Sequence, residues 1–121
     1  MEEEFDKYKE PQTQFEKDLE SSSKNLFLDI REVLLSYPQM LELQKSIITT
    51  FADDNGPICN MRTMKQTVEI TFLKGIKMKD RFKLLTGTGR EMRSLIMHKA
   101  DTEILKYYID QAVAINSKRR R

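Results

Sequence analysis

Several residue types are scarce in this chain of 121 residues, and each scarcity excludes a class of protein. The single cysteine, Cys59, cannot form an internal disulfide, so we expect a reducing, cytoplasmic location. No run of apolar residues approaches the roughly 18 that a membrane-spanning helix needs, which argues against a membrane protein. The acidic start at residues 1–4 lacks the apolar stretch of a secretory signal, and we expect none.

Residues that usually carry catalysis are equally sparse. His98 is the only histidine, and no histidine lies beside Cys59 in the sequence, so neither residue forms an evident nucleophile–base pair. No zinc-type cysteine or histidine spacing and no EF-hand loop is present, so we expect no cofactor. The adjacent carboxylates Asp53 and Asp54 are weak candidates for a hard metal ion, although turn chemistry explains them more simply. We therefore expect a non-enzymatic protein.

Charge is plentiful but unevenly distributed. Residues 1–24 contain eight acids and four bases, a net charge of −4, whereas residues 25–121 contain eleven acids and seventeen bases, a net charge of +6. Residues 62–99 alone hold ten bases against three acids. Such a block attracts an anionic small molecule or an acidic protein partner, or is simply a solvated surface. The isoelectric point of about 8.6 argues against nucleic acid as the partner.

Hydrophobic periodicity predicts helices in the first third of the chain. Residues 1–24 form an acidic leader in which Phe15 and Leu19 share one helical face, so this leader is either a short helix or mobile. A wide apolar stripe predicts a helix over residues 25–37, capped by the preceding serines and ended by Pro38. Pro38 then opens a second short helix that reaches about Gln44.

The period then changes to that of strands. Residues 47–51 fit a short strand or an extended link, and residues 58–64 and 67–73 predict an antiparallel hairpin with its turn at Lys65-Gln66. Residues 92–98 predict one more strand. Asp101 or Thr102 caps a final amphipathic helix, and residues 117–121 form a basic tail. This order predicts an α+β fold with two layers, in which an antiparallel sheet packs against N-terminal and C-terminal helices.

The most unusual segment is residues 84–93, in which two glycines flank one threonine. At least one of these glycines is expected to adopt a positive φ, because the turn is so tight. Exposed amide groups beside arginine side chains would bind phosphate or carboxylate. The segment lacks the Lys-Ser/Thr pair of a P-loop and the third glycine of a dinucleotide-binding fingerprint, and a purely structural turn is the alternative. The candidate anion-binding residues are Lys74, Gly87, Gly89, Arg90 and Arg93.

Two of these segments resemble the YdhG-like family, a group of small domains of largely unknown function. The strand end Phe72-Leu73-Lys74-Gly75 resembles the aromatic-Lys-Gly element of the family. The turn from Leu85 to Arg93 resembles the family pattern Leu-x-Gly-x-Gly-Lys-x-x-Arg, with Arg90 in place of the usual lysine. The resemblance spans residues 25–116 as one domain and implies a two-layer α+β fold.

The chain also departs from the family pattern. It contains no tryptophan, and only Pro57 remains of the Trp/Tyr-x-x-Pro segment that members usually carry. Ser94 stands where members often have histidine. We expect the domain to bind an anionic ligand or partner at the turn from Gly87 to Arg93. Because some members are described as frataxin-like intracellular iron chaperones, the resemblance also implies an alternative, an iron-binding chaperone.

Overall fold

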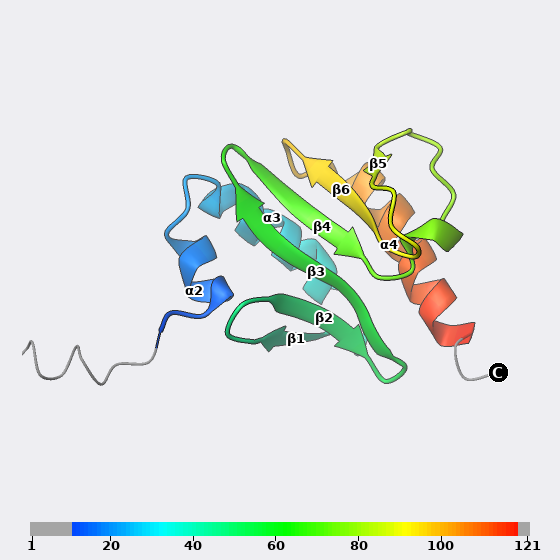
Figure 1. Ribbon diagram of the computed structural model, residues 1–121, viewed down its shortest axis with the longest axis horizontal. Coiled ribbons are helices and arrows are strands. Elements are labelled where there is room, and N and C mark those ends of the chain that lie inside the picture. The colour runs from blue at the N-terminus through cyan, green and yellow to red at the C-terminus, as the bar shows by residue number, and fades with distance from the viewer. Residues whose placement is uncertain (1–10, 119–121) are drawn as a thin grey trace, which may run out of the picture.

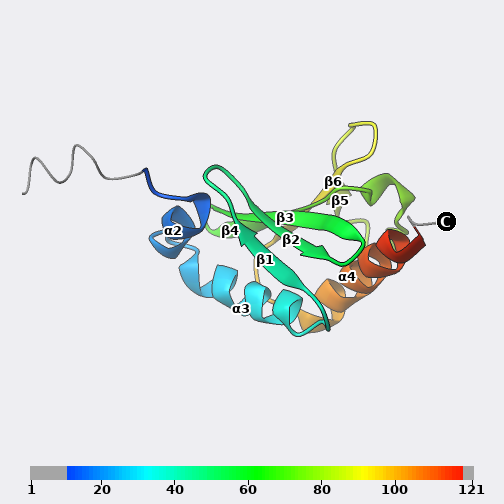
Figure 2. The same ribbon diagram turned by 90° about the horizontal axis from the view of Figure 1, so that it is seen from below.

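The computed structural model describes residues 11–118, so the first ten residues of the acidic leader and the last three of the basic tail lie outside the described part. It confirms the predicted α+β class, because a six-stranded antiparallel sheet carries helices from both ends of the chain on one face (Figures 1 and 2). The helices are α2 (Gln14–Leu19), α3 (Lys24–Leu35), η1 (Gly75–Lys77) and α4 (Thr102–Ser117). The strands are β1 (Leu41–Gln44), β2 (Thr49–Asp53), β3 (Gly56–Met64), β4 (Thr67–Phe72), β5 (Leu85–Thr86) and β6 (Arg93–Met97).

The predicted helix at residues 25–37 is α3, and its apolar stripe buries Phe27, Ile30 and Leu34. The expectation that a serine side chain caps the start of α3 is wrong. Ser23 occupies the N-cap position of α3 but makes no side-chain cap bond, and its hydroxyl donates instead to the carbonyl of Met64 at 2.8 Å. That bond ties the start of α3 to the end of β3.

The short helix within the leader is α2. Thr13 and Glu16 form a reciprocal capping box at its start, which satisfies backbone donors that a six-residue helix would otherwise leave unpaired. Asp18 is fully buried, and its Oδ1 accepts hydrogen bonds from the Thr63 amide at 3.0 Å and the Thr63 hydroxyl at 2.7 Å. These contacts fix α2 against β3.

The second short helix expected after Pro38 is wrong, because residues 41–44 form strand β1. Gln39 adopts a left-handed backbone with φ 66°, which interrupts any helical path. Leu41 and Leu43 then alternate with Glu42, and Glu42 pairs with Arg31 of α3 through two hydrogen bonds of 2.6 and 2.8 Å. Pairing with β2 satisfies the backbone groups on one edge of β1.

The strand order is β1-β2-β3-β4-β6-β5, and every neighbouring pair is antiparallel. The predicted hairpin turn at Lys65-Gln66 joins β3 and β4, and Gln66 accommodates it with φ 65°. The strand predicted at residues 92–98 is β6, which inserts between β4 and the two-residue β5. Its Leu95 and Met97 are buried, whereas Met92 lies outside the strand and is 51% exposed.

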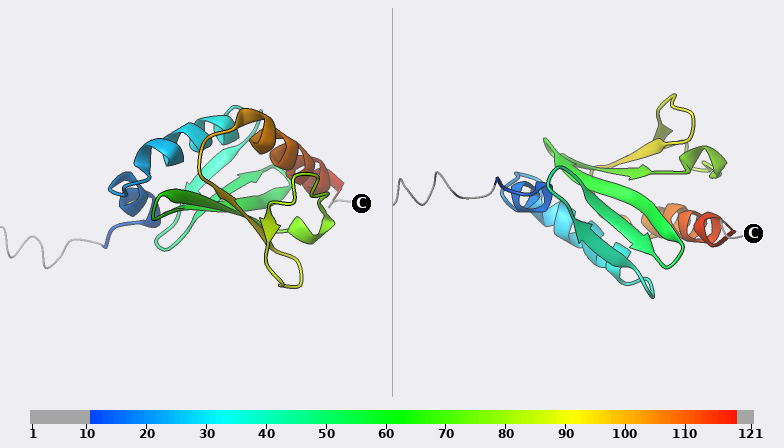
Figure 3. Two further views of the ribbon diagram at one scale, coloured as in Figure 1. Left: turned by 90° about the horizontal axis from the view of Figure 1, so that it is seen from above. Right: turned by 60° about the horizontal axis from the view of Figure 1, so that its bottom comes forward.

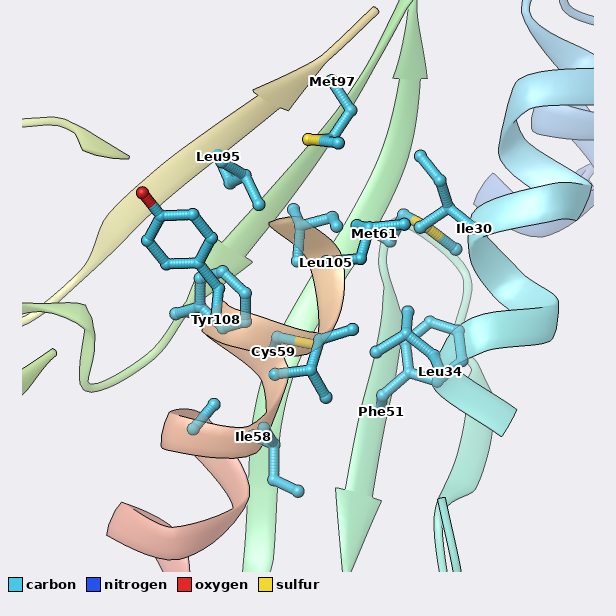
Figure 4. Packing of buried hydrophobic residues seen from close by; sticks show 14 of the residues in the cluster. Ile30, Leu34, Phe51, Ile58, Cys59, Met61, Leu95, Met97, Leu105 and Tyr108 are labelled. Atoms are coloured by element: carbon cyan, nitrogen blue, oxygen red, sulfur yellow. The ribbon is translucent and has the colours of Figure 1, made fainter. Parts of the chain in front are cut away.

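Helix α4 closes the core. Asp101 caps it as predicted, because its carboxylate accepts a hydrogen bond from the Ile104 amide at 3.2 Å. Figure 4 shows Leu105 and Tyr108 of α4 lying against side chains of the sheet, including Leu95 and Cys59. The fully buried side chains of the core include Phe27, Ile30, Leu34, Phe51, Val68, Ile70, Leu95, Leu105, Tyr108 and Ile109.

Among the described residues, no helix covers the opposite face of the sheet, here called the open face. Figure 3 shows α3 and α4 on one side of the sheet and the loop between β5 and β6 projecting on the other side. Within residues 11–118, no helix combines the length and the apolarity that crossing a membrane requires.

Candidate anion-binding segment

The candidate residues belong to the connection between β4 and β6, here called the basic segment (residues 74–93). It contains η1 and β5 and forms the edge of the sheet opposite β1. Its last part, the loop between β5 and β6, projects away from the two covering helices (Figure 3). This loop is therefore accessible on the open face, whereas the earlier part of the segment lies beside α4.

Gly75 allows the basic segment to approach β6 closely. A Cβ atom on Gly75 would lie 2.5 Å from the Cβ of Arg93 and 2.7 Å from its backbone nitrogen, distances that real Cβ atoms do not show. The amide of Ile76 donates to the carbonyl of Glu91 at 2.8 Å, which ties η1 to the chain just before β6. The two glycine-containing elements noted in the sequence thus contact each other, and Lys74 is carried to the start of β6.

The glycine turn has the geometry that the sequence predicts at one of its two positions. Gly87 has φ 119°, a value that side chains rarely adopt, whereas Gly89 has no such strain. The guanidinium of Arg93 donates from Nη1 to the carbonyls of Gly89 and Met92, each at 2.7 Å. The Arg93 side chain therefore closes the turn, and its charge bonds to neutral carbonyl groups, with no ion pair to an acid among residues 11–118.

Arg90 differs from Arg93 in its role. Arg93 bonds to the backbone of the turn, whereas Arg90 is exposed on the projecting loop. The basic segment contains seven bases and two acids, a net charge of +5. In the described chain, ion pairs within 4 Å join Arg31 to Glu42 and Arg62 to Glu69, and none involves a base of this segment. The segment thus carries a net positive charge that Asp80 offsets only in part, through its attraction to Lys83. Its exposed bases are Lys77, Lys79, Arg81, Lys83 and Arg90.

Asp80 organises the first half of the segment, and the sequence analysis did not single it out. Its Oδ1 accepts hydrogen bonds from the Tyr108 hydroxyl at 2.5 Å and from the Leu84 amide at 2.9 Å. Burial by itself would raise the pKa of Asp80, but the hydrogen bonds from Tyr108 and from the amides of Leu84 and Leu85 outweigh it and lower the pKa. The sequence signal that could have identified Asp80 is its place at the start of a loop, where aspartate commonly accepts hydrogen bonds from nearby backbone amides.

Helix α4 holds the same part of the segment through its side chains. Gln111 brackets Lys79, accepting from its amide at 2.7 Å and donating to its carbonyl at 3.0 Å. The Arg81 guanidinium lies 4.5 Å from the ring centre of Phe82 and 5.1 Å from that of Tyr107. These contacts fix a stretch that the sequence describes only as loop-rich.

The two candidate metal ligands, Asp53 and Asp54, lie where β2 turns into β3. Asp53 Oδ1 accepts from the Asn55 amide at 2.8 Å and from Asn116 Nδ2 at 2.9 Å, so Asp53 joins the β2–β3 turn to the end of α4. Asp54 is exposed beside it. Among residues 11–118, no three His, Cys, Asp or Glu residues gather where they could share a metal ion. Cys59 is fully buried, and burial raises the pKa of its thiol to about 12.

The open face also holds a cavity of about 310 Å³ between the β1–β2 turn and the middle of the sheet. Its polar side chains bond to their neighbours on the sheet. Asn60 Oδ1 accepts from the Thr50 hydroxyl at 2.8 Å, and Arg62 donates to Glu69 at 2.8 Å. Because these groups satisfy each other in pairs, they do not converge on a common point, and the basic segment stays the stronger candidate.

Comparison of the chain with models of protein families, with curated proteins and with solved structures finds no match.

Proposed function

We propose that this protein is a non-enzymatic binding domain that holds an anionic ligand or an acidic protein partner on the basic segment. The observation that carries the proposal is that none of the seven bases of this segment is in an ion pair within the described chain. Uncompensated charge of one sign raises the local concentration of ions of the other sign.

The segment combines fixed and exposed parts in a way that suits this role. The Gly75–Arg93 contact and the bonds of Asp80 fix its path, so little conformational entropy is lost when a ligand binds. Arg90 extends the charge onto the projecting loop. A charge-assisted hydrogen bond contributes about 1.5–3 kcal/mol at best, and exposure to water lowers that value. We expect affinities in the high-micromolar to millimolar range for phosphate-like ligands, weakening as salt is added.

We also propose that the chain is a divergent YdhG-like domain. The support is that Gly75 and Arg93, which belong to two separate motifs of the resemblance, lie in contact. This contact explains structurally why the two motifs occur together. The iron-chaperone alternative draws less support, because Asp53 is engaged by Asn55 and Asn116 and no larger group of potential ligands is brought together among the described residues.

The test is an NMR titration of ¹⁵N-labelled protein with inorganic phosphate at about 20 mM ionic strength, where the Debye length exceeds 20 Å and charge effects are large. We expect phosphate-dependent amide shifts concentrated in residues 74–93. Arg90→Gln should lower the affinity about two- to fivefold without changing the midpoint of urea unfolding. Lys24→Gln, which removes an exposed base at the start of α3, serves as the matched control and should leave the affinity unchanged.

Shifts spread evenly over the surface, or equal losses from the two substitutions, would show that phosphate senses only the net charge. That result would reject the basic segment as a site. An acidic peptide titrated in the same way distinguishes the two ligand classes, because a protein partner requires additional contacts and should bind more tightly than phosphate.

A further inference from the structure

The free edge of β1 combines unpaired backbone with exposed apolar side chains. Strand β1 stands at one end of the strand order, so within the described chain one of its edges has no neighbouring strand. Leu41 is 57% exposed, Leu43 is 40% exposed, and Ile47 in the adjoining turn is 84% exposed. Exposed strand edges pair readily with other strands, and natural proteins usually blunt them with proline, bulges or inward charges. Along its four residues this edge has no proline and no bulge, and its one inward charge, that of Glu42, is paired with Arg31 of α3.

The backbone pairing of β1 fixes which of its groups point outward. The amide of Lys45 donates to the carbonyl of Ile48 at 3.0 Å, which makes this pair the first hydrogen-bonded pair of the β1–β2 hairpin. Hydrogen-bonded and non-hydrogen-bonded pairs alternate along an antiparallel ladder. The backbone amide and carbonyl groups of Leu41 and Leu43 therefore bond to β2, whereas those of Glu42 and Gln44 point to the free edge.

The two faces of β1 differ in chemistry. Glu42 points to the helical layer, because its carboxylate pairs with Arg31 of α3 at 2.6 Å. Since side chains alternate along a strand, Leu41 and Leu43 project onto the open face. Beside Arg31, a groove of about 480 Å³ follows α3 and includes Leu28 and Leu35 in its lining.

We propose that β1 binds β1 of a second copy of this chain, antiparallel, about a two-fold axis at Leu43. In this register Glu42 lies opposite Gln44 of the partner subunit, and the two-fold axis repeats this pair. Each of the two pairs exchanges two backbone hydrogen bonds, which makes four across the interface. Leu43 lies opposite Leu43 of the partner subunit, and Leu41 lies opposite Lys45 of the partner subunit. No two like charges face each other, whereas centring the axis on Glu42 would oppose two carboxylates.

The helical layer extends the same interface. A pair of four-residue strands alone would not reach the roughly 1,000 Å² that a stable interface buries. Because Arg31 joins α3 to β1, the two-fold axis that pairs the strands also brings the α3 grooves of both copies together, with Leu28 and Leu35 supplying apolar surface. The result is one twelve-stranded sheet with a basic segment at each end, and the proposal does not depend on what those segments bind.

Oligomeric state tests the proposal directly. Sedimentation equilibrium of the full chain should show a dimer, and Leu43→Lys and Leu43→Asp should each sediment as monomers. Mixing the two variants should restore a dimer, because opposite charges then meet at the axis. Met92→Lys is the control, since Met92 is similarly exposed but lies on the loop before β6, and this variant should stay dimeric.

A cysteine substitution tests the register. Side chains directly opposite in a non-hydrogen-bonded pair have Cβ atoms about 4.5–5.5 Å apart, within reach of a disulfide. Leu43→Cys should therefore form a covalent dimer with oxidised glutathione, while Ile47→Cys, more exposed but outside the paired strand, should not. Cys59 is buried and does not compete. A wild-type monomer at about 1 mM protein, or equal cross-linking at both positions, would overturn the proposal, and so would pairing of this edge with a foreign peptide only.

Discussion

At the scale of single residues, two glycines of the basic segment have opposite requirements. Gly75 lies against the backbone of Arg93, whereas a Cβ on Gly89 would lie 3.9 Å from the Met92 carbonyl oxygen, an ordinary van der Waals contact. A methyl group is therefore excluded at the first position and tolerated at the second. Gly75 is a packing residue, and Gly89 is open to substitution.

We expect Gly75→Ala to lower the free energy of unfolding by about 1–3 kcal/mol, the usual cost of forcing an extra carbon into a packed site. Gly89→Ala should change it by less than about 0.5 kcal/mol. Urea denaturation of both variants gives the comparison. Equal stabilities would mean that η1 and β6 do not approach as closely as the structure has them.

Asp80 predicts a pH dependence of stability. Its pKa is lowered in the folded protein, so its contribution is present above the usual value of 3.8 and is lost as the pH falls through the lower folded-state value. Asp80→Asn keeps the shape but weakens the bonds from Tyr108 and Leu84. It should cost about 1–2 kcal/mol at pH 7, since the carboxylate is partly exposed.

The same substitution should flatten the stability profile below pH 4, because the group that titrates there is gone. Urea midpoints measured from pH 7 down to pH 2 report this slope. A variant that loses stability in parallel with the wild type over this range would show that other carboxylates carry the acid sensitivity.

At the scale of elements, α4 supplies a large part of the core. Leu105, Tyr108 and Ile109 are all fully buried against the sheet. Leu105→Ala should lower the free energy of unfolding by about 2–5 kcal/mol, from lost burial and the cavity that remains. Lys106→Ala, at the next and exposed position, is the control and should have little effect. A loss below about 0.5 kcal/mol for Leu105→Ala would place α4 outside the core.

Elements with strong periodicity were predictable from the sequence, and short ones were not. Helix α3, the β3–β4 hairpin and α4 each bury a regular series of side chains, so their patterns determine their structure. Strand β1 has four residues and follows a proline that is equally suited to opening a helix. Its state depends on the pairing with β2 and on the left-handed Gln39, neither of which a local pattern reveals.

The candidate site, too, was predictable from the sequence only in part. The glycines and bases of the basic segment were identifiable, and the spacing of Gly87 and Gly89 predicted a positive φ at one or both of them, which the structure has at Gly87. The acceptors of Arg93 were not predictable, because they are backbone carbonyls that any sequence would supply. Asp80 bonds to Tyr108, which lies 28 positions away, so its role arises only in the folded chain.

At the scale of the whole molecule, the helical layer draws on both ends of the described chain. We expect a chain that stops after Ala100 to lack a native fold, because the buried face of α4 would be missing from the core. It should bind the dye ANS and lose its near-ultraviolet circular dichroism. A chain that stops after Ser117 should retain both native properties. A native spectrum from the shorter chain would contradict the two-layer architecture.

The position of β6 between β4 and β5 has a consequence for synthesis on the ribosome. The first four strands emerge in the order in which they pair, but β4 must wait for a neighbour that follows some twenty residues later. During that interval the inner face of the sheet has no α4 to cover it, and the growing polypeptide exposes apolar surface of the kind that chaperones bind. Completion of the fold therefore has to wait until β6 and α4 have both been made, so the interval in which residues 73–117 are synthesised is the one in which the unfinished sheet is most open to aggregation.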